Sequence, residues 1–136
     1  MTVLSEETAK EQIAALLDYY DFAVDDLPPN LRPGMEAALR QLERAVMKGT
    51  LEVEVTDDDC TVHHHLKRPP KGMSNPVVYH QVTGECKVAI RDDDASYAKT
   101  YTFLAALSRE ERKFFLEMKG KDLSISESLG ALFLQV

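Results

Sequence analysis

The chain has 136 residues and a formal net charge of −7, and 44% of its residues are hydrophobic. This size and composition are typical of one globular domain and exclude a largely disordered chain. An acidic protein without a concentrated basic stripe is a poor binder of nucleic acid or anionic membranes, because phosphate neutralisation supplies most of that affinity. The charge is also uneven, since residues 1–59 carry −9 and residues 60–136 carry +2. Such a split allows head-to-tail self-association or a basic protein partner.

We expect no segment for secretion or for membrane insertion in this sequence. Its first ten residues are polar and acidic, whereas a signal peptide has a basic start and an apolar run. No apolar stretch approaches the roughly 18 residues that span a bilayer. Cys60 and Cys86 are the only cysteines, and so few thiols predict small buried side chains in a reducing cytoplasm, not a disulfide framework.

Two amphipathic helices are predicted near the N-terminus. Ser5 precedes two glutamates, which is the pattern of an N-cap with acids in the first turn. Apolar residues at helical spacing extend this helix over about 6–22. After a proline-rich connector, Pro33 suits the first turn of a second helix over about 34–48. Gly49 is expected to end that helix.

The apolar period then changes to two, which predicts about four strands within about 51–91. A first hairpin turns at Asp57–Asp59 and a second turns at Thr83-Gly84. Residues 67–76 lie between the hairpins and contain three prolines and a glycine, so we expect a long exposed loop there. The last strand is expected to place Cys86, Val88 and Ile90 on one face.

Helices are predicted again over about 95–135. Asp92–Asp94 is expected to cap the first of them. Ser108 and Glu111 have the spacing of a capping box and predict the start of a short helix, which Gly120 would end. The element order predicts an α+β fold for the whole chain as a single domain. An antiparallel sheet of about four strands is flanked by N-terminal and C-terminal helices.

The histidines form the only pattern that suggests a metal. In a strand, His63 and His65 point to one face, and His80 could approach them from the next hairpin. Three imidazoles would form an open zinc site, whereas histidines on a wet sheet face need no metal at all. The aspartate runs Asp57–Asp59 and Asp92–Asp94 lack the alternation of a calcium loop, and turn and cap chemistry explains them.

No motif in the chain predicts catalysis. The nucleophile elbow, the phosphate-binding loops and the metalloprotease helix are all absent. A nucleophilic pair of Cys60 or Cys86 with a nearby histidine is conceivable, but both thiols fall on the apolar register of their strands, where thiols are inert. We therefore expect a protein that is not an enzyme, with no catalytic residues and no cofactor. The alternative is a small metal-binding protein or metal-dependent enzyme that uses His63, His65 and His80.

Spare apolar surface points instead to protein binding. Two adjacent aromatic rings cannot both face the core from one helix face, so one of Phe114 and Phe115 is expected to reach a partner. Leu132 and Phe133 belong to an apolar C-terminal end that is too large to remain wet. The alternative is that all four pack inside the domain.

The C-terminal 85 or so residues resemble the tail assembly chaperones of long-tailed bacteriophages and prophages. The resemblance rests on a hairpin that leads into LKRPP at 66–70, followed by YTFLAAL at 101–107 with Ser108, KDL at 121–123 and LFL at 132–134. It implies a protein without enzyme activity or cofactor, in the cytoplasm of the bacterial host. Such a protein would self-associate, coat the long helical tape measure protein and help to recruit tail tube subunits.

Overall fold

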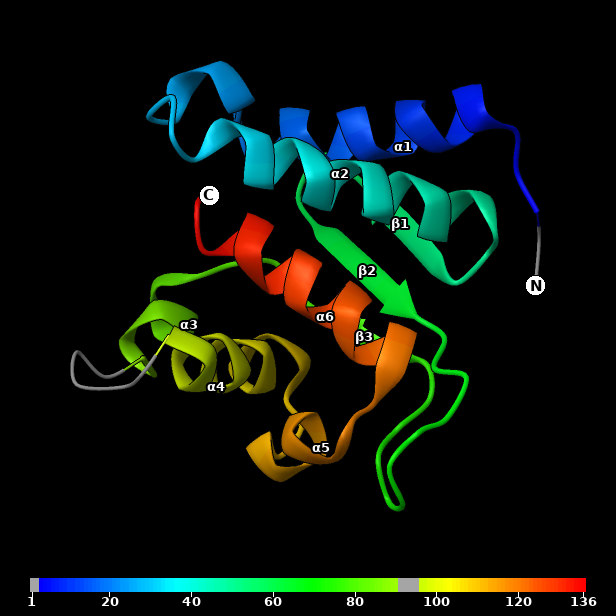
Figure 1. Cartoon of the computed structure of the whole chain (residues 1–136), viewed down its shortest axis with the longest axis vertical. Coiled ribbons are helices and arrows are strands. Elements are labelled where there is room, and N and C mark those ends of the chain that lie inside the picture. The colour runs from blue at the N-terminus through cyan, green and yellow to red at the C-terminus, as the bar shows by residue number, and fades with distance from the viewer. Residues whose placement is uncertain (1–2, 91–95) are drawn as a thin grey trace.

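In the computed structural model, which describes residues 3–90 and 96–136, helices cover one face of a small antiparallel sheet (Figure 1). The helical elements are α1 (Glu6–Tyr19), the 3-10 turn η1 (Val24–Asp26), α2 (Arg32–Met47), α3 (Gly84–Val88), α4 (Ser96–Ser108), α5 (Arg112–Glu117) and α6 (Gly120–Phe133). The strands are β1 (Leu51–Val55), β2 (Cys60–His64) and β3 (Val77–Tyr79). The predicted α+β class is confirmed.

The two N-terminal helices start and stop close to the predicted points. Ser5 caps α1, because its hydroxyl accepts the backbone N–H of Thr8 at 3.1 Å. The helix ends at Tyr19, three residues before the predicted end, and Asp21 adopts a left-handed φ of 52°. Helix α2 begins two residues early, with Pro33 in its first turn. Gly49 follows the end of α2 with a φ of 80°, a conformation that favours glycine.

The sheet has the order β1-β2-β3, and both neighbouring pairs are antiparallel. The predicted first hairpin is confirmed, with Leu51 opposite His64 and Val55 opposite Cys60. Because side chains alternate along a strand, one face is buried against helices and the other carries Glu52 and other polar groups.

Within residues 3–90 and 96–136 the sheet has three strands, so the prediction of about four strands is wrong. The segment expected to form the fourth is helix α3. Cys86 is buried and Ile90 is half-buried four residues later, whereas Val88 between them is 84% exposed. A strand would place all three on one face, but a helical turn separates Val88 from the others. Glu85 in the first turn also suits a helix start.

The predicted boundaries of the C-terminal helices are wrong at two points. Ser108 ends α4 and donates its hydroxyl to the Leu104 carbonyl at 2.7 Å, so it does not cap the next helix. Glu111 is the residue before α5, and its side chain makes no capping bond. Gly120 is the first residue of α6, not a stop after α5. Hydrogen bonding back to the preceding turn is a competing use of a serine hydroxyl that spacing alone does not exclude.

The described helices are short. The longest of them, α2, has 16 residues, and no helix in the described ranges is long and apolar enough to cross a bilayer. Helix α4 begins near the predicted residue 95. The predicted N-cap at Asp92–Asp94 lies outside the described residues.

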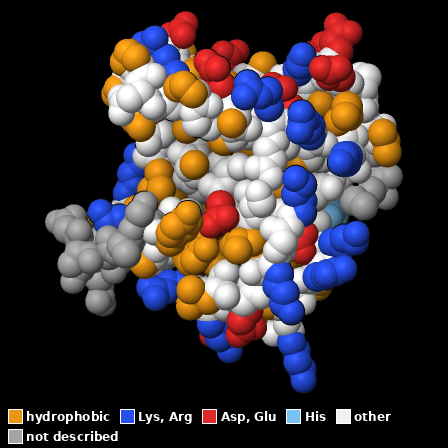
Figure 2. Space-filling view, viewed as in Figure 1, with side chains coloured by type: hydrophobic (Ala, Val, Ile, Leu, Met, Phe, Trp, Pro, Cys, Tyr) orange, Lys and Arg blue, Asp and Glu red, His pale blue; other side chains and the backbone are white. Residues whose placement is uncertain are grey.

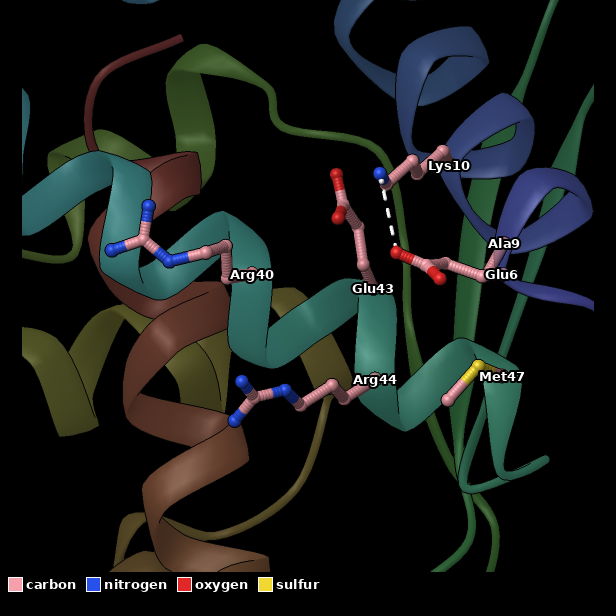
Figure 3. A pocket seen from close by; sticks show the side chains of 7 residues that line it. All are labelled: Glu6, Ala9, Lys10, Arg40, Glu43, Arg44 and Met47. Atoms are coloured by element: carbon pink, nitrogen blue, oxygen red, sulfur yellow. Dashed lines mark ion pairs between the residues drawn. The ribbon is translucent and has the colours of Figure 1, made fainter.

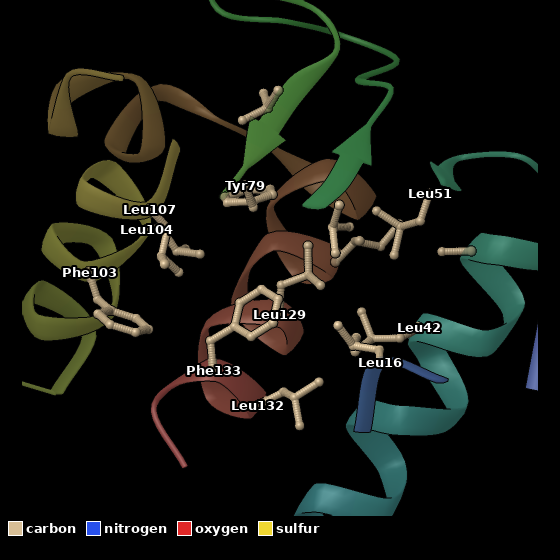
Figure 4. Packing of buried hydrophobic residues seen from close by; sticks show 14 of the residues in the cluster. Leu16, Leu42, Leu51, Tyr79, Phe103, Leu104, Leu107, Leu129, Leu132 and Phe133 are labelled. Atoms are coloured by element: carbon tan, nitrogen blue, oxygen red, sulfur yellow. The ribbon is translucent and has the colours of Figure 1, made fainter. Parts of the chain in front are cut away.

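One hydrophobic core joins all these elements (Figure 4). Its fully buried large side chains come from five helices and two strands: Leu16, Leu42, Leu51, Tyr79, Phe103, Leu104, Leu107, Phe115, Leu129, Leu132 and Phe133. Helix α6 runs through the centre and packs beside α2, where the Gln41 amide bonds to the hydroxyls of Ser124 at 2.7 Å and Ser128 at 2.6 Å.

A small polar cluster is buried within this core. The Tyr79 hydroxyl donates to Ser126 Oγ at 3.2 Å, and Ser126 Oγ also lies 3.3 Å from His64 Nδ1 and 3.3 Å from Met118 Sδ. His64 Nε2 has no partner. If the His64 proton is on Nδ1, every hydrogen of the cluster finds an acceptor, because Ser126 then donates to the Met118 sulfur. We therefore assign the tautomer with the proton on Nδ1. In this tautomer the lone pair of Nε2 has no donor, whereas the other tautomer would leave a buried Nε2–H without an acceptor.

Candidate functional site

The histidines expected to bind metal are divided between separate environments. His63 and His65 do share the outer side of the sheet, as predicted, but each approaches a glutamate of β1. His63 Nε2 lies 3.9 Å from Glu54, and His65 Nε2 contacts Glu52 at 2.5 Å. These pairs are partly exposed and resemble ordinary cross-strand contacts between opposite charges.

His80 follows β3, where its backbone N–H donates to the Leu107 carbonyl. Burial and the Arg109 cation lower the pKa of its imidazole. Within residues 3–90 and 96–136, no three histidine, cysteine or carboxylate side chains lie close enough together to hold a metal ion. The three histidines therefore do not form the open zinc site on which the metal-binding alternative depends.

Both cysteines are buried and free, as predicted. Burial raises the pKa of the Cys60 thiol to about 11, which leaves very little nucleophilic thiolate near neutral pH. The Cys86 sulfur lies 3.5 Å from the Thr83 hydroxyl. Cys86 and His80 line one surface hollow, but no hydrogen bond joins either thiol to a histidine among the described residues, so the nucleophilic pair considered above is not formed.

The four apolar residues expected to bind protein all lie in the core. Phe115 is 0% exposed, and Phe114, Leu132 and Phe133 are also buried. The two adjacent rings can both be covered because the short α5 lies between α4 and the 66–76 loop. The Phe114 ring lies under Gly72 of that loop, while Phe115 enters the main core. Leu116 is the exposed apolar residue of this helix, at 59%. No accessible binding surface is formed by the four predicted residues.

The molecule also has a basic surface that no sequence pattern indicates. Four exposed cations from α2 and the start of α6 form it, and we call this set the basic surface: Arg40, Arg44, Lys119 and Lys121. Antiparallel packing of α2 against α6 places Arg44 and Lys121 at the same end of the helix pair, since Gln41 bonds to Ser124. Figure 2 shows lysine and arginine side chains gathered over these elements. None of the four forms an ion pair with a described acidic residue.

The basic surface includes one wall of a groove between α1 and α2 (Figure 3). Ala9 and Met47 line the groove, and Lys10 pairs with Glu6 at 3.3 Å on the α1 side. In Figure 3, Arg40 and Arg44 extend away from that ion pair. The groove lining holds no histidine, cysteine or hydroxyl group and consists of charged and apolar side chains. Its chemistry suits binding of a charged side chain.

A loop rich in cations and prolines adjoins the basic surface. The proline loop, Lys67–Lys71, contains three exposed cations and two consecutive prolines. Asp122 holds it in place, because this buried carboxylate accepts the backbone N–H groups of Lys67 at 3.0 Å and Arg68 at 2.9 Å. Asn75 closes the wider loop through paired bonds to the Leu66 backbone. The loop is therefore fixed to α6 despite its exposure.

Replacing Asp122 by asparagine tests this attachment. The asparagine side chain has one acceptor oxygen instead of two and carries no charge. The two charge-assisted bonds from the backbone N–H groups of Lys67 and Arg68 are therefore replaced by one neutral bond. We expect the free energy of unfolding to fall by about 2 kcal/mol, and amide hydrogen exchange to speed up at residues 67 and 68. Urea unfolding and exchange measurements check both effects. An unchanged exchange rate at these two amides would contradict the attachment.

The other end of the β1–β2 hairpin is acidic. There, a shallow hollow is lined by Asp18, Tyr19 and Tyr20 at the end of α1, and by Val55, Asp57 and Gln81; we call it the tyrosine hollow. Burial and then the charges of Asp59 and Asp58 raise the pKa of the Tyr19 phenol. The two charged regions of the molecule are thus separated by the length of the hairpin.

The uneven distribution of charge is visible in the sequence, but the basic surface and the tyrosine hollow are not. The basic residues of α2 and α6 are 75 or more positions apart in the chain, and only helix packing unites them. The one local signal was the LKRPP segment, in which prolines hold cations on an exposed, stiff backbone.

Comparisons with protein-family models, with curated proteins and with solved structures gave no match to this chain.

Proposed function

We propose that this protein is a non-catalytic binding and assembly protein, and that it serves as a phage or prophage tail assembly chaperone whose client is a tape measure protein. The observation that carries the binding role is the basic surface. Four cations are exposed at one place on a protein of net charge −7, without an acidic partner in the described chain. Surface charges left unpaired in this way are available to a partner and steer its approach.

The client is inferred to be protein, not nucleic acid. A nucleic-acid site needs many phosphate contacts, whereas the basic surface is small and the opposite end of the hairpin is acidic. A long helical client that displays carboxylates at one-turn intervals would match Arg40 and Arg44, which are themselves spaced i, i+4 along α2. The resemblance to tail assembly chaperones supplies the specific client, and the buried state of Phe114 and Phe115 favours recognition through charge.

The test is affinity purification of the tagged protein from its source cells after prophage induction, in parallel with Lys119→Glu/Lys121→Glu. We expect the parent protein to recover a long helical protein of the tape measure type, or a tail tube protein, and the double variant to recover at least tenfold less. Lys87→Glu is the matched control, because it reverses an exposed cation of α3 that belongs neither to the basic surface nor to the groove lining.

Two outcomes would count against the proposal. Recovery of the bait alone would remove the client, and equal recovery by the double variant would remove the basic surface as its binding site. Thermal unfolding of each variant shows whether a loss of recovery reflects a loss of fold.

A further inference from the structure

The tyrosine hollow has the chemistry of a site for a basic, proline-containing segment. Extended prolines pack against aromatic rings in many recognition grooves, because the proline backbone is already fixed and loses little entropy on binding. The hollow offers two tyrosine rings together with the carboxylates of Asp18 and Asp57. A ligand that combined prolines with flanking cations would satisfy both features.

The rings of the hollow are held in place before any ligand arrives. The Tyr19 hydroxyl donates to Gln81 Oε1 at 2.6 Å, and the Tyr20 hydroxyl accepts the backbone N–H of Val82 at 3.0 Å. The two rings meet edge to face with centroids 5.0 Å apart, and Tyr20 also packs against Phe133 in the core. A rigid site of this kind avoids the entropy cost of ordering side chains on binding.

The chain itself carries a segment with this chemistry. The proline loop has the sequence Lys-Arg-Pro-Pro-Lys, with exposed cations on both sides of the two prolines. It is attached to α6 through Asp122 and closed by Asn75. Its three cations form no ion pair with a described acidic residue. Both partners of the contact are therefore preorganised and carry opposite charge.

The loop cannot reach the hollow of its own molecule. Val55 and Asp57 of the hollow precede β2, whereas the proline loop follows it. Five residues of extended strand span about 16 Å, and Figure 1 shows the loop projecting at the far end of β2 from the C-terminal end of α1. A contact between loop and hollow must therefore join two molecules.

We propose that the proline loop of one copy docks in the tyrosine hollow of a second copy, so that the protein associates head to tail. Pro69 and Pro70 lie against Tyr19 and Tyr20, and the flanking cations face Asp18 and Asp57. A pair joined in this way still has one free loop and one free hollow, so association continues into a chain or closes into a ring. The contact is weakened by salt, because its charged part is exposed at the rim. Client binding through the basic surface uses different residues and does not depend on it.

The test uses two charge-reversal variants of the purified full chain, the loop variant Arg68→Glu/Lys71→Glu and the hollow variant Asp18→Lys/Asp57→Lys. Light scattering after size-exclusion chromatography measures the mass of each. We expect the parent protein to form concentration-dependent oligomers and each variant alone to be monomeric. An equimolar mixture of the two should oligomerise again, because the native loop of one variant meets the native hollow of the other and the two reversed sites also carry opposite charge.

Further variants separate the proposed contact from general charge effects. Glu7→Lys, at the other end of α1 from the hollow, should oligomerise like the parent. Pro69→Ala/Pro70→Ala leaves the charge unchanged and should weaken self-association at least fivefold. A parent protein that stays monomeric at millimolar concentration overturns the proposal. So does a loop or hollow variant that oligomerises like the parent, or a mixture that remains monomeric. All these measurements use purified protein, so they stand apart from the recovery of a client.

Discussion

Replacing Phe115 by alanine is expected to lower the free energy of unfolding by about 3–5 kcal/mol. The ring is 0% exposed and belongs to the same core as Phe103 and Leu129. Its removal loses the transfer free energy of the ring and leaves a cavity that the surrounding helices fill only in part. Because an ordinary domain is stable by about 5–15 kcal/mol, this single change is expected to bring the chain close to unfolding. Urea unfolding followed by circular dichroism measures the loss.

Leu116 is the matched control for this prediction. It is the next residue of α5 and is 59% exposed, so Leu116→Ala is expected to change the free energy of unfolding by about 0.5 kcal/mol or less. The two variants also distinguish a Phe115 ring that packs in the core from one that binds a partner. A Phe115 side chain that served a partner could be removed without loss of stability. Equal stabilities for the two alanine variants would contradict the burial described here.

The second large effect is a loss of folding stability at acidic pH. Burial lowers the pKa of His64 to about 4, and the Asp122 carboxylate offsets part of that shift. In the unfolded chain the imidazole titrates near its ordinary value of about 6.5. Above that pH the imidazole is neutral in both states, and its contribution to stability is fully present. Between about pH 6.5 and 4 only the unfolded chain takes up the proton, so stability falls as the pH falls.

The size of the acid effect follows from the shift. Each pH unit in this window removes about 1.4 kcal/mol, which amounts to roughly 3 kcal/mol between pH 6.5 and 4. His64→Leu is expected to remove this part of the pH dependence, so its urea midpoint should change much less than that of the parent between pH 7.5 and 4.5. His63→Asn, on the outer face of the same strand, should keep the parent's dependence. Parallel pH profiles for the parent and His64→Leu would exclude His64 as the cause.

The elements that sequence predicted well are those in which one local pattern has one structural solution. The stripe of α2 and the alternation of β1 each allow a single buried face, so both were placed to within two residues. Cys86, Val88 and Ile90 are different, because residues at i and i+4 are compatible with a strand and with one turn of helix. Tertiary packing selected the helix, by burying Cys86 and leaving Val88 exposed.

The candidate surfaces were less predictable for a physical reason. The sequence shows which side chains are charged, but not which charges have neighbours. Arg44 and Lys121 become one surface only because Gln41 and Ser124 join α2 to α6. Helix geometry alone predicts that one of Phe114 and Phe115 is exposed, whereas the 66–76 loop supplies the cover that the second ring, Phe114, needs. Contacts of this kind depend on segments that are distant in the chain.

The strand order β1-β2-β3 leaves β1 and β3 as the two rims of the sheet. An open rim presents unpaired backbone groups to which a strand from another chain can add, which is the first step of many aggregates. Here β3 has only three residues, and β1 carries Glu52 and Glu54 on its solvent face. A short rim on one side and a negatively charged rim on the other both oppose strand addition. Both features lower the tendency of the sheet to add a strand from another molecule and so to start an aggregate.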